Sequence, residues 1–236
     1  MSGEKRFLER AGRQHPGLRL LVLLAGILTA STHAVAADPA TIRFALDFPD
    51  SNPDHYVISV ESDGRAHYES SGKLSPESDD SSSYQTDFSL SDAVRSRIFA
   101  LAAQAHYFSG KVDSGNKKLA FTGKKTLSYK DSQRTSEAEY NFSPLAPVQQ
   151  LTTLFENMGA TLEYGHRLSY FHRYQKLALD DELKRMEDQA RRGDLAELQA
   201  VKPVLQEIYD DGSVINVVRA RALRIMEMPP NWPAGN

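Results

Sequence analysis

The spacing of apolar residues changes part-way along this chain, and that change limits which fold the chain can adopt. Ile42, Phe44, Leu46 and Phe48 stand at every second position, which predicts a strand with one buried face. After Pro147 the apolar residues recur every three or four positions, as on one side of a helix. Strands followed by helices predict an α+β fold, in one domain or in two adjoining ones.

The first half of the chain predicts an antiparallel sheet of hairpins with one packed helix. The expected strands cover residues 41–48, 56–60, 65–69, 118–122, 126–129 and 137–142. Asp63-Gly64 predicts a tight turn, because glycine tolerates the positive φ of such turns. Ser91 is a suitable N-cap for a helix that runs to about His106, and residues 70–83 predict a surface loop. These elements form an α+β domain over residues 37–158.

The second half predicts only helices. They are expected at residues 148–158, 161–179, 180–192, 195–209 and 214–228. Gly159 is expected to end the first of them, and Pro203 should kink or restart the fourth. We therefore expect a C-terminal helical region over residues 159–228 and a tail over residues 229–236.

The first 36 residues read as a cleavable signal peptide. Five basic residues precede an apolar run from Leu20 to Leu28, and Ala34-Val35-Ala36 is a site of the kind that signal peptidase cuts. The apolar run is about half the length needed to span a bilayer. We therefore expect an exported protein, periplasmic or secreted, with no membrane span after processing. An uncleaved N-terminal membrane anchor is the alternative.

The chain has no cysteine and a formal net charge of -3. Without cysteine there are no disulfides, no cysteine-ligated zinc, no iron–sulfur clusters and no thiol nucleophiles. A slightly acidic chain has no overall electrostatic attraction to nucleic acid, so we expect no nucleic-acid partner.

The order of elements in the first half resembles a family of uncharacterised bacterial envelope domains. The resemblance covers Phe44 to Met158. It rests on the Tyr-x-x-x-Val-x-x-Asp-Gly hairpin from Tyr56 to Gly64, a helix that ends in Tyr107-Phe108, and a helix that begins near Pro147. Members often carry a cysteine-containing N-terminal segment, which this chain lacks. Because the family has no assigned activity, the resemblance implies a fold and a compartment but no functional residues.

A lysine-rich stretch with interleaved aromatic residues is one candidate partner surface. Lys117, Lys118, Lys124 and Lys125 could contact an anionic surface, such as lipid head groups, an acidic polysaccharide or an acidic envelope protein. The alternative, which the sequence favours, is a solvated hairpin whose lysines discourage pairing of strand edges.

An aromatic cluster on the expected helix 161–179 is the second candidate. It contains Tyr164, Tyr170, Phe171 and Tyr174. Tyr170 and Tyr174 could contact a glycan or a peptide by stacking and hydrogen bonding. Two aromatic sides on one helix are more typical of burial on both sides, so packing in the core is favoured.

We find no catalytic, cofactor-binding or metal-binding motif. No two histidines have the four-residue spacing of a helical zinc site, and the acidic segment 47–54 has turn residues rather than the spacing of a calcium loop. The leading hypothesis is a non-catalytic exported module that binds another cell-envelope component. The alternative is a hydrolase of envelope glycans or esters that uses carboxylates. A concave pocket with two inward carboxylates of shifted pKa would favour the hydrolase, and a flat face with exposed Tyr or Phe side chains would favour the binding module.

Overall fold

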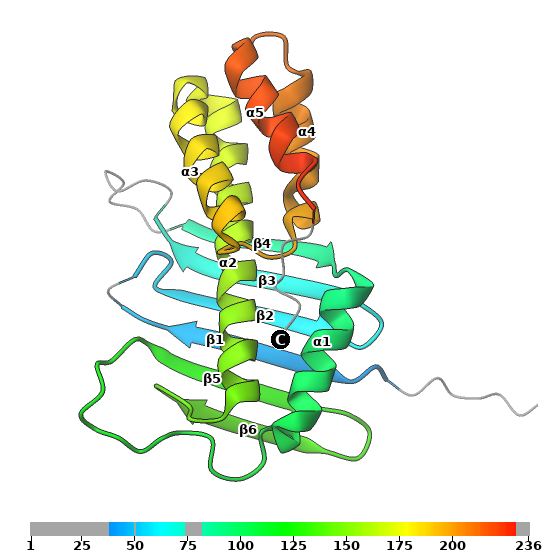
Figure 1. Ribbon diagram of the computed structural model, residues 1–236, viewed down its shortest axis with the longest axis vertical. Coiled ribbons are helices and arrows are strands. Elements are labelled where there is room, and N and C mark those ends of the chain that lie inside the picture. The colour runs from blue at the N-terminus through cyan, green and yellow to red at the C-terminus, as the bar shows by residue number, and fades with distance from the viewer. Residues whose placement is uncertain (1–37, 50, 74–81, 230–236) are drawn as a thin grey trace, which may run out of the picture. The chain divides into compact units, whose positions relative to one another are not determined.

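The computed structural model describes residues 38–49, 51–73 and 82–229. The predicted signal peptide (1–36) and most of the predicted tail (229–236) lie outside these residues. The strands are β1 (Thr41–Asp47), β2 (His55–Glu61), β3 (Arg65–Gly72), β4 (Ser82–Ser89), β5 (Lys124–Lys130) and β6 (Thr135–Tyr140). They form one antiparallel sheet in the order β4-β3-β2-β1-β5-β6 (Figure 1). The predicted α+β fold is confirmed.

The helices are α1 (Asp92–Gln104), α2 (Ala146–Tyr174), α3 (Leu179–Arg192), α4 (Lys202–Asp210) and α5 (Asn216–Met226). Three short 3₁₀ segments, η1 (His106–Phe108), η2 (Lys176–Ala178) and η3 (Leu198–Val201), lie between them. Of these helices, α1 and α2 cross one face of the sheet, and α2 runs from the β6 side to the β4 side (Figure 1).

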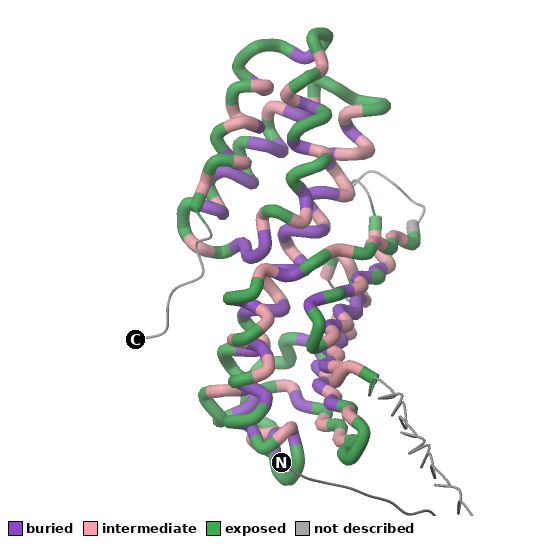
Figure 2. The backbone as a smooth tube through the Cα atoms, turned by 90° about the vertical axis from the view of Figure 1, so that its right-hand side faces the viewer, coloured by how far each residue is buried: buried purple, intermediate pink, exposed green. Residues whose placement is uncertain are grey.

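The strand registers place apolar side chains in rows beneath these two helices. Phe44 of β1 lies opposite Ile58 of β2 and Leu127 of β5, and all three are fully buried. Phe155 of α2 stacks on Phe44, with ring centroids 5.2 Å apart and planes at 2°. Each such side chain contributes about 1.5–3 kcal/mol when it leaves water. The first core therefore lies between the sheet and the two helices, and buried and more exposed positions alternate along the strands (Figure 2).

The opposite face of the sheet carries polar side chains. One row across five strand pairs consists of Asp87, His67, Ser59, Arg43, Ser128 and Glu137. Polar residues alternating with apolar ones are expected when only one face of an antiparallel sheet is covered. In the described part of the chain, no helix packs on that face.

A second core forms around the C-terminal half of α2. It contains Leu168 and Phe171 of α2 together with apolar residues of α3, α4 and α5, such as Leu183, Leu205 and Ile225. Pro203 lies in the first turn of α4, directly after η3, which confirms that this proline restarts a helix. The described residues of the predicted C-terminal region are mainly helical, as expected, and their helices pack around this core.

The prediction that a helix ends near Gly159 is wrong. Helix α2 is continuous over 29 residues and contains both Gly159 and Gly165. Both glycines let a neighbouring side chain pack closely against the backbone of α2. A Cβ atom on Gly159 would lie 3.1 Å from Cε2 of Tyr56, and one on Gly165 would lie 2.5 Å from Cγ1 of Val201. The helix persists because neighbouring side chains occupy the space that the missing Cβ atoms leave.

Two expectations about strands also need correction. Residues 118–122 form no strand, because the side chain of Asn141 accepts from the N–H of Thr122 and donates to the carbonyl of Ala120. Conversely, Ser82–Ser89 forms β4, a strand that we did not predict, and it pairs with β3 along its length. The expected loop 70–83 is therefore shorter than predicted at both ends.

Candidate binding groove

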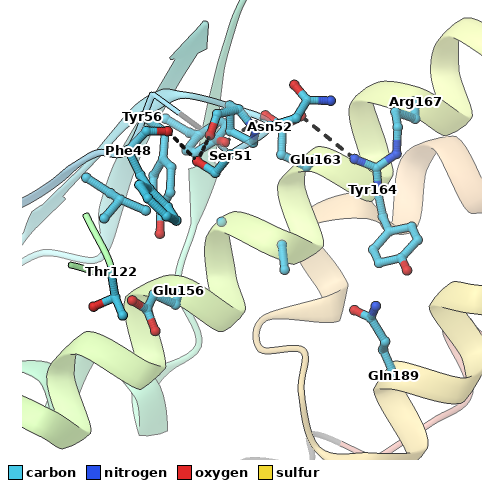
Figure 3. Close-up of a pocket in the computed structure, with 15 residues that line it drawn as sticks. Phe48, Ser51, Asn52, Tyr56, Thr122, Glu156, Glu163, Tyr164, Arg167 and Gln189 are labelled. Atoms are coloured by element: carbon cyan, nitrogen blue, oxygen red, sulfur yellow. Dashed lines mark hydrogen bonds and ion pairs between the residues drawn. The ribbon is translucent and has the colours of Figure 1, made fainter. Parts of the chain in front are cut away.

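Two adjoining cavities follow α2 on the side opposite α1. Their volumes are about 410 and 490 Å³, and Thr122 and Glu156 line both of them. The first cavity lies between α2, the β1–β2 turn and α3, and the second lies between α2 and the segment that follows β6. We call the two cavities together the α2 groove (Figure 3 shows the first).

One side of α2 provides the wall of the groove. Glu156, Gly159, Ala160, Glu163 and Arg167 line the first cavity, and their spacing of three or four residues places them on one side of the helix. The two small residues leave open space between the longer side chains. The sequence signal that could have pointed to the groove is the presence of charged residues at 156, 163 and 167 with small residues between them on one side of α2.

Glu163 connects α2 to the sheet. Its Oε1 accepts hydrogen bonds from the hydroxyls of Tyr68 and Ser70 of β3, both at 2.7 Å. Nδ1 of His166 lies 3.9 Å and Nη1 of Arg167 4.0 Å from its Oε2. Burial by itself would raise the pKa of Glu163, but the interactions with His166, Ser70 and Tyr68 outweigh it and lower the pKa. This carboxylate is ionised and committed to internal contacts.

Glu156 also lines the first cavity, but its contacts differ from those of Glu163. It is half-buried, its side chain points into the groove toward Thr122 (Figure 3), and within the described residues no hydrogen bond reaches it. Burial raises the pKa of Glu156, and attraction to Lys125 opposes the shift only in part. A half-buried carboxyl group with no hydrogen-bond partner among the described residues is available to a ligand.

The four predicted lysine contacts lie in different surroundings. Lys125 is buried, and its ammonium donates to the carbonyl and the hydroxyl of Thr122 at 3.0 and 3.1 Å. Burial lowers its pKa. Lys125 therefore does not present its charge at the surface, contrary to our expectation of a solvated hairpin. Lys124 lies 3.1 Å from Glu139 and 3.8 Å from Asp47, whereas Lys117 and Lys118 are exposed.

The aromatic residues of α2 divide between core and surface. Tyr164 and Phe171 are buried, as packing in the core requires. Tyr170 is half-buried, and Tyr174 is 70% exposed with its ring centroid 5.1 Å from that of Tyr170. Tyr174 follows Glu156 by 18 positions, which is about 27 Å along a helix. Neither Tyr170 nor Tyr174 lines either cavity of the groove.

Two phenylalanines that the sequence analysis did not select line the groove, and Phe121 of the lysine-rich stretch lies next to one of them. Phe48 lines the first cavity and Phe142 the second, where it is 43% exposed. Phe121 is 57% exposed and meets the ring of Phe48 edge-on, with centroids 5.9 Å apart. Exposed phenylalanine rings beside a cavity are typical of ligand-binding surfaces.

The polar side chains of Ser51 and Asn52 in the β1–β2 turn already form hydrogen bonds within the protein. The Ser51 hydroxyl donates to the carbonyls of Phe48 and Pro53, and the side-chain amide of Asn52 exchanges two hydrogen bonds with the backbone of Lys73.

Over the described residues, no group of three or more His, Asp or Glu side chains could hold a metal ion. The search of the same residues also finds no helix able to cross a membrane.

Comparisons with known proteins found no relative: no family model matches the chain, and no curated protein matches it. The resemblance to uncharacterised envelope domains stays a prediction. The function must therefore be inferred from the groove.

Proposed function

We propose that this protein is a non-catalytic exported module that binds another component of the cell envelope through the α2 groove. The observation that carries the proposal is that Glu156, which has no hydrogen-bond partner among the described residues, lines one cavity together with the exposed ring of Phe142. Apolar anchors combined with a few polar groups are typical of binding sites, and each cavity has a volume within the usual range for ligand sites.

A hydrolase is the second candidate, and one observation favours it. Glu156 and Glu163 line the same cavity, and their pKa values move in opposite directions, as expected for an acid and a base. However, Glu163 is held by Tyr68 and Ser70. This commitment of Glu163 to internal contacts favours binding over catalysis.

Export to the periplasm or to the medium is the second part of the proposal. It rests on the basic, apolar and small-residue segments of residues 1–36. N-terminal sequencing of the protein recovered from the cell envelope tests it. A first residue of Ala37 or Asp38 would support cleavage, and an intact leader would support the membrane anchor instead.

Photo-crosslinking in intact cells tests the use of the groove. A benzophenone-bearing amino acid replaces Phe142 in one variant and Glu137, which is exposed on the opposite face of the sheet, in a matched control. Mass spectrometry then identifies peptide or sugar adducts. We expect a reproducible adduct from position 142 and none from position 137. Adducts only from position 137, or from neither position, would contradict the proposal.

A further inference from the structure

The rim of the α2 groove offers flat apolar rings to a ligand. Phe142 lines the second cavity and is 43% exposed. Phe121 lines neither cavity but is 57% exposed and meets the ring of Phe48, which lines the first, edge-on. The C–H groups on one side of a pyranose ring form an apolar surface that stacks on such rings, while its hydroxyls point outward. The rim therefore fits a ligand made of rings with polar edges.

The floor of the groove offers hydrogen-bond acceptors. Glu156 points into both cavities, and the exposed Thr153 lines the second one beside it. The side-chain N–H of Gln149 donates to the backbone carbonyl of Ser143. The side-chain carbonyl oxygen of Gln149 accepts no hydrogen bond from the described residues. Such groups match ligand hydroxyls or amide N–H groups.

The charges in the groove disfavour an anionic ligand. Within the described lining, the only cations are Lys125 and Arg167, and both are engaged. Lys125 donates to Thr122, and Nε of Arg167 lies 2.6 Å from Glu182. Two carboxylates, Glu156 and Glu163, balance these cations. A phosphorylated or carboxylated chain would find no free partner for its charge.

The backbone next to the groove is already paired, which argues against a peptide bound as an added strand. The N–H of Asn141 donates to Asp113, the carbonyl of Phe142 accepts from Ser114, and the carbonyl of Ser143 accepts from Gln149. Recognition by strand addition needs a row of free N–H and C=O groups. The groove offers side chains instead.

We infer that the α2 groove binds a neutral glycan chain, whose ring faces stack on Phe142 and Phe121 and whose hydroxyl or amide N–H donates to Glu156. The inference rests on the proposed function and adds the class of ligand. It requires no bond to be made or broken.

Titration of the purified full chain with short β-1,4-linked oligomers of N-acetylglucosamine and of glucose tests the inference by calorimetry. We expect saturable binding of at least one oligomer, and an approximately tenfold loss of affinity in Phe142→Ala and in Phe121→Ala. Glu156→Ala should weaken binding, whereas Glu156→Gln should retain most of it, because the amide oxygen still accepts a hydrogen bond. Tyr174→Ala removes a more exposed ring that lines neither cavity and should leave affinity unchanged. Circular dichroism checks that each variant is folded.

The outcomes separate this inference from the proposed function. If position 142 crosslinks to a partner in cells but neither oligomer binds, the glycan inference fails and the binding function stands. Oligomer binding that is insensitive to the Phe121, Phe142 and Glu156 changes would also overturn the inference. Stronger binding of an acidic oligosaccharide would overturn the assignment of a neutral ligand. Cleavage of a bound oligomer would overturn the non-catalytic part of the proposed function.

Discussion

The carboxylate of Glu197 accepts two hydrogen bonds from Ser91, one from its backbone N–H at 2.9 Å and one from its hydroxyl at 2.7 Å. Ser91 is the N-cap of α1, and Glu197 directly precedes η3 in the helical region. A negative charge at a helix N-terminus is favourable because the N–H groups there lack partners within the helix. This contact joins the helical region to a helix that packs on the sheet.

Removal of Glu197 should therefore weaken the whole fold. Glu197 is buried, and we expect Glu197→Ala to lower the free energy of unfolding by about 1–2 kcal/mol, the scale of a lost N-cap. Urea denaturation measures this change. Ser91→Ala should produce a similar loss, and the double variant should lose less than the sum of the two. Additive losses would show that the two residues do not act through one contact.

Glu163 should make stability depend on pH in the acidic range. Its pKa is lowered in the folded protein from the ordinary value of 4.5, so its contribution is complete above pH 4.5 and is lost as the pH falls through the lower folded value. At neutral pH, Glu163→Gln should unfold with about 1–2 kcal/mol less free energy than the wild type. Urea denaturation at several pH values should show that the difference shrinks on acidification. A difference that is constant with pH would contradict an ionised Glu163.

Glu156 should have the opposite effect. Burial raises its pKa above 4.5, so ionisation destabilises the folded protein as the pH rises through and beyond that value. Glu156→Gln should stabilise the protein at neutral pH by about 0.5–1 kcal/mol, on the scale of single stabilising changes. The gain should vanish below pH 4.5 in thermal or urea unfolding. A loss of stability at neutral pH would indicate an internal partner for Glu156 and weaken its assignment as a ligand contact.

Gly165 should not tolerate a side chain. In an unobstructed helix, Gly→Ala stabilises by about 1 kcal/mol, but here the new Cβ would lie 2.5 Å from Val201. We expect Gly165→Ala to destabilise the protein by about 1–3 kcal/mol, as in other overpacked cores. Val201→Ala in the same chain should recover part of the loss. If calorimetry shows Gly165→Ala to be stabilising by itself, the close packing of α2 on η3 is wrong.

Local patterns were sufficient for much of the fold. The alternation around Phe44, the turn at Asp63-Gly64 and the N-cap at Ser91 all predicted elements that the structure contains. Each of these signals depends on residues that are neighbours in the chain. We did not predict β4, although Tyr84, Phe88 and Leu90 stand at alternate positions in and directly after it and pack in or against the first core.

What the sequence determined by itself was the class of the fold, because the period of apolar residues reports which side of an element must leave water. Only the tertiary structure decided that Lys125 is buried, that α2 continues through Gly159, and that Glu156 faces a groove beside Phe142. Each of these depends on segments that lie far apart in sequence. A binding site is formed by side chains from several elements. The spacing of residues within one element does not indicate which other elements it will contact.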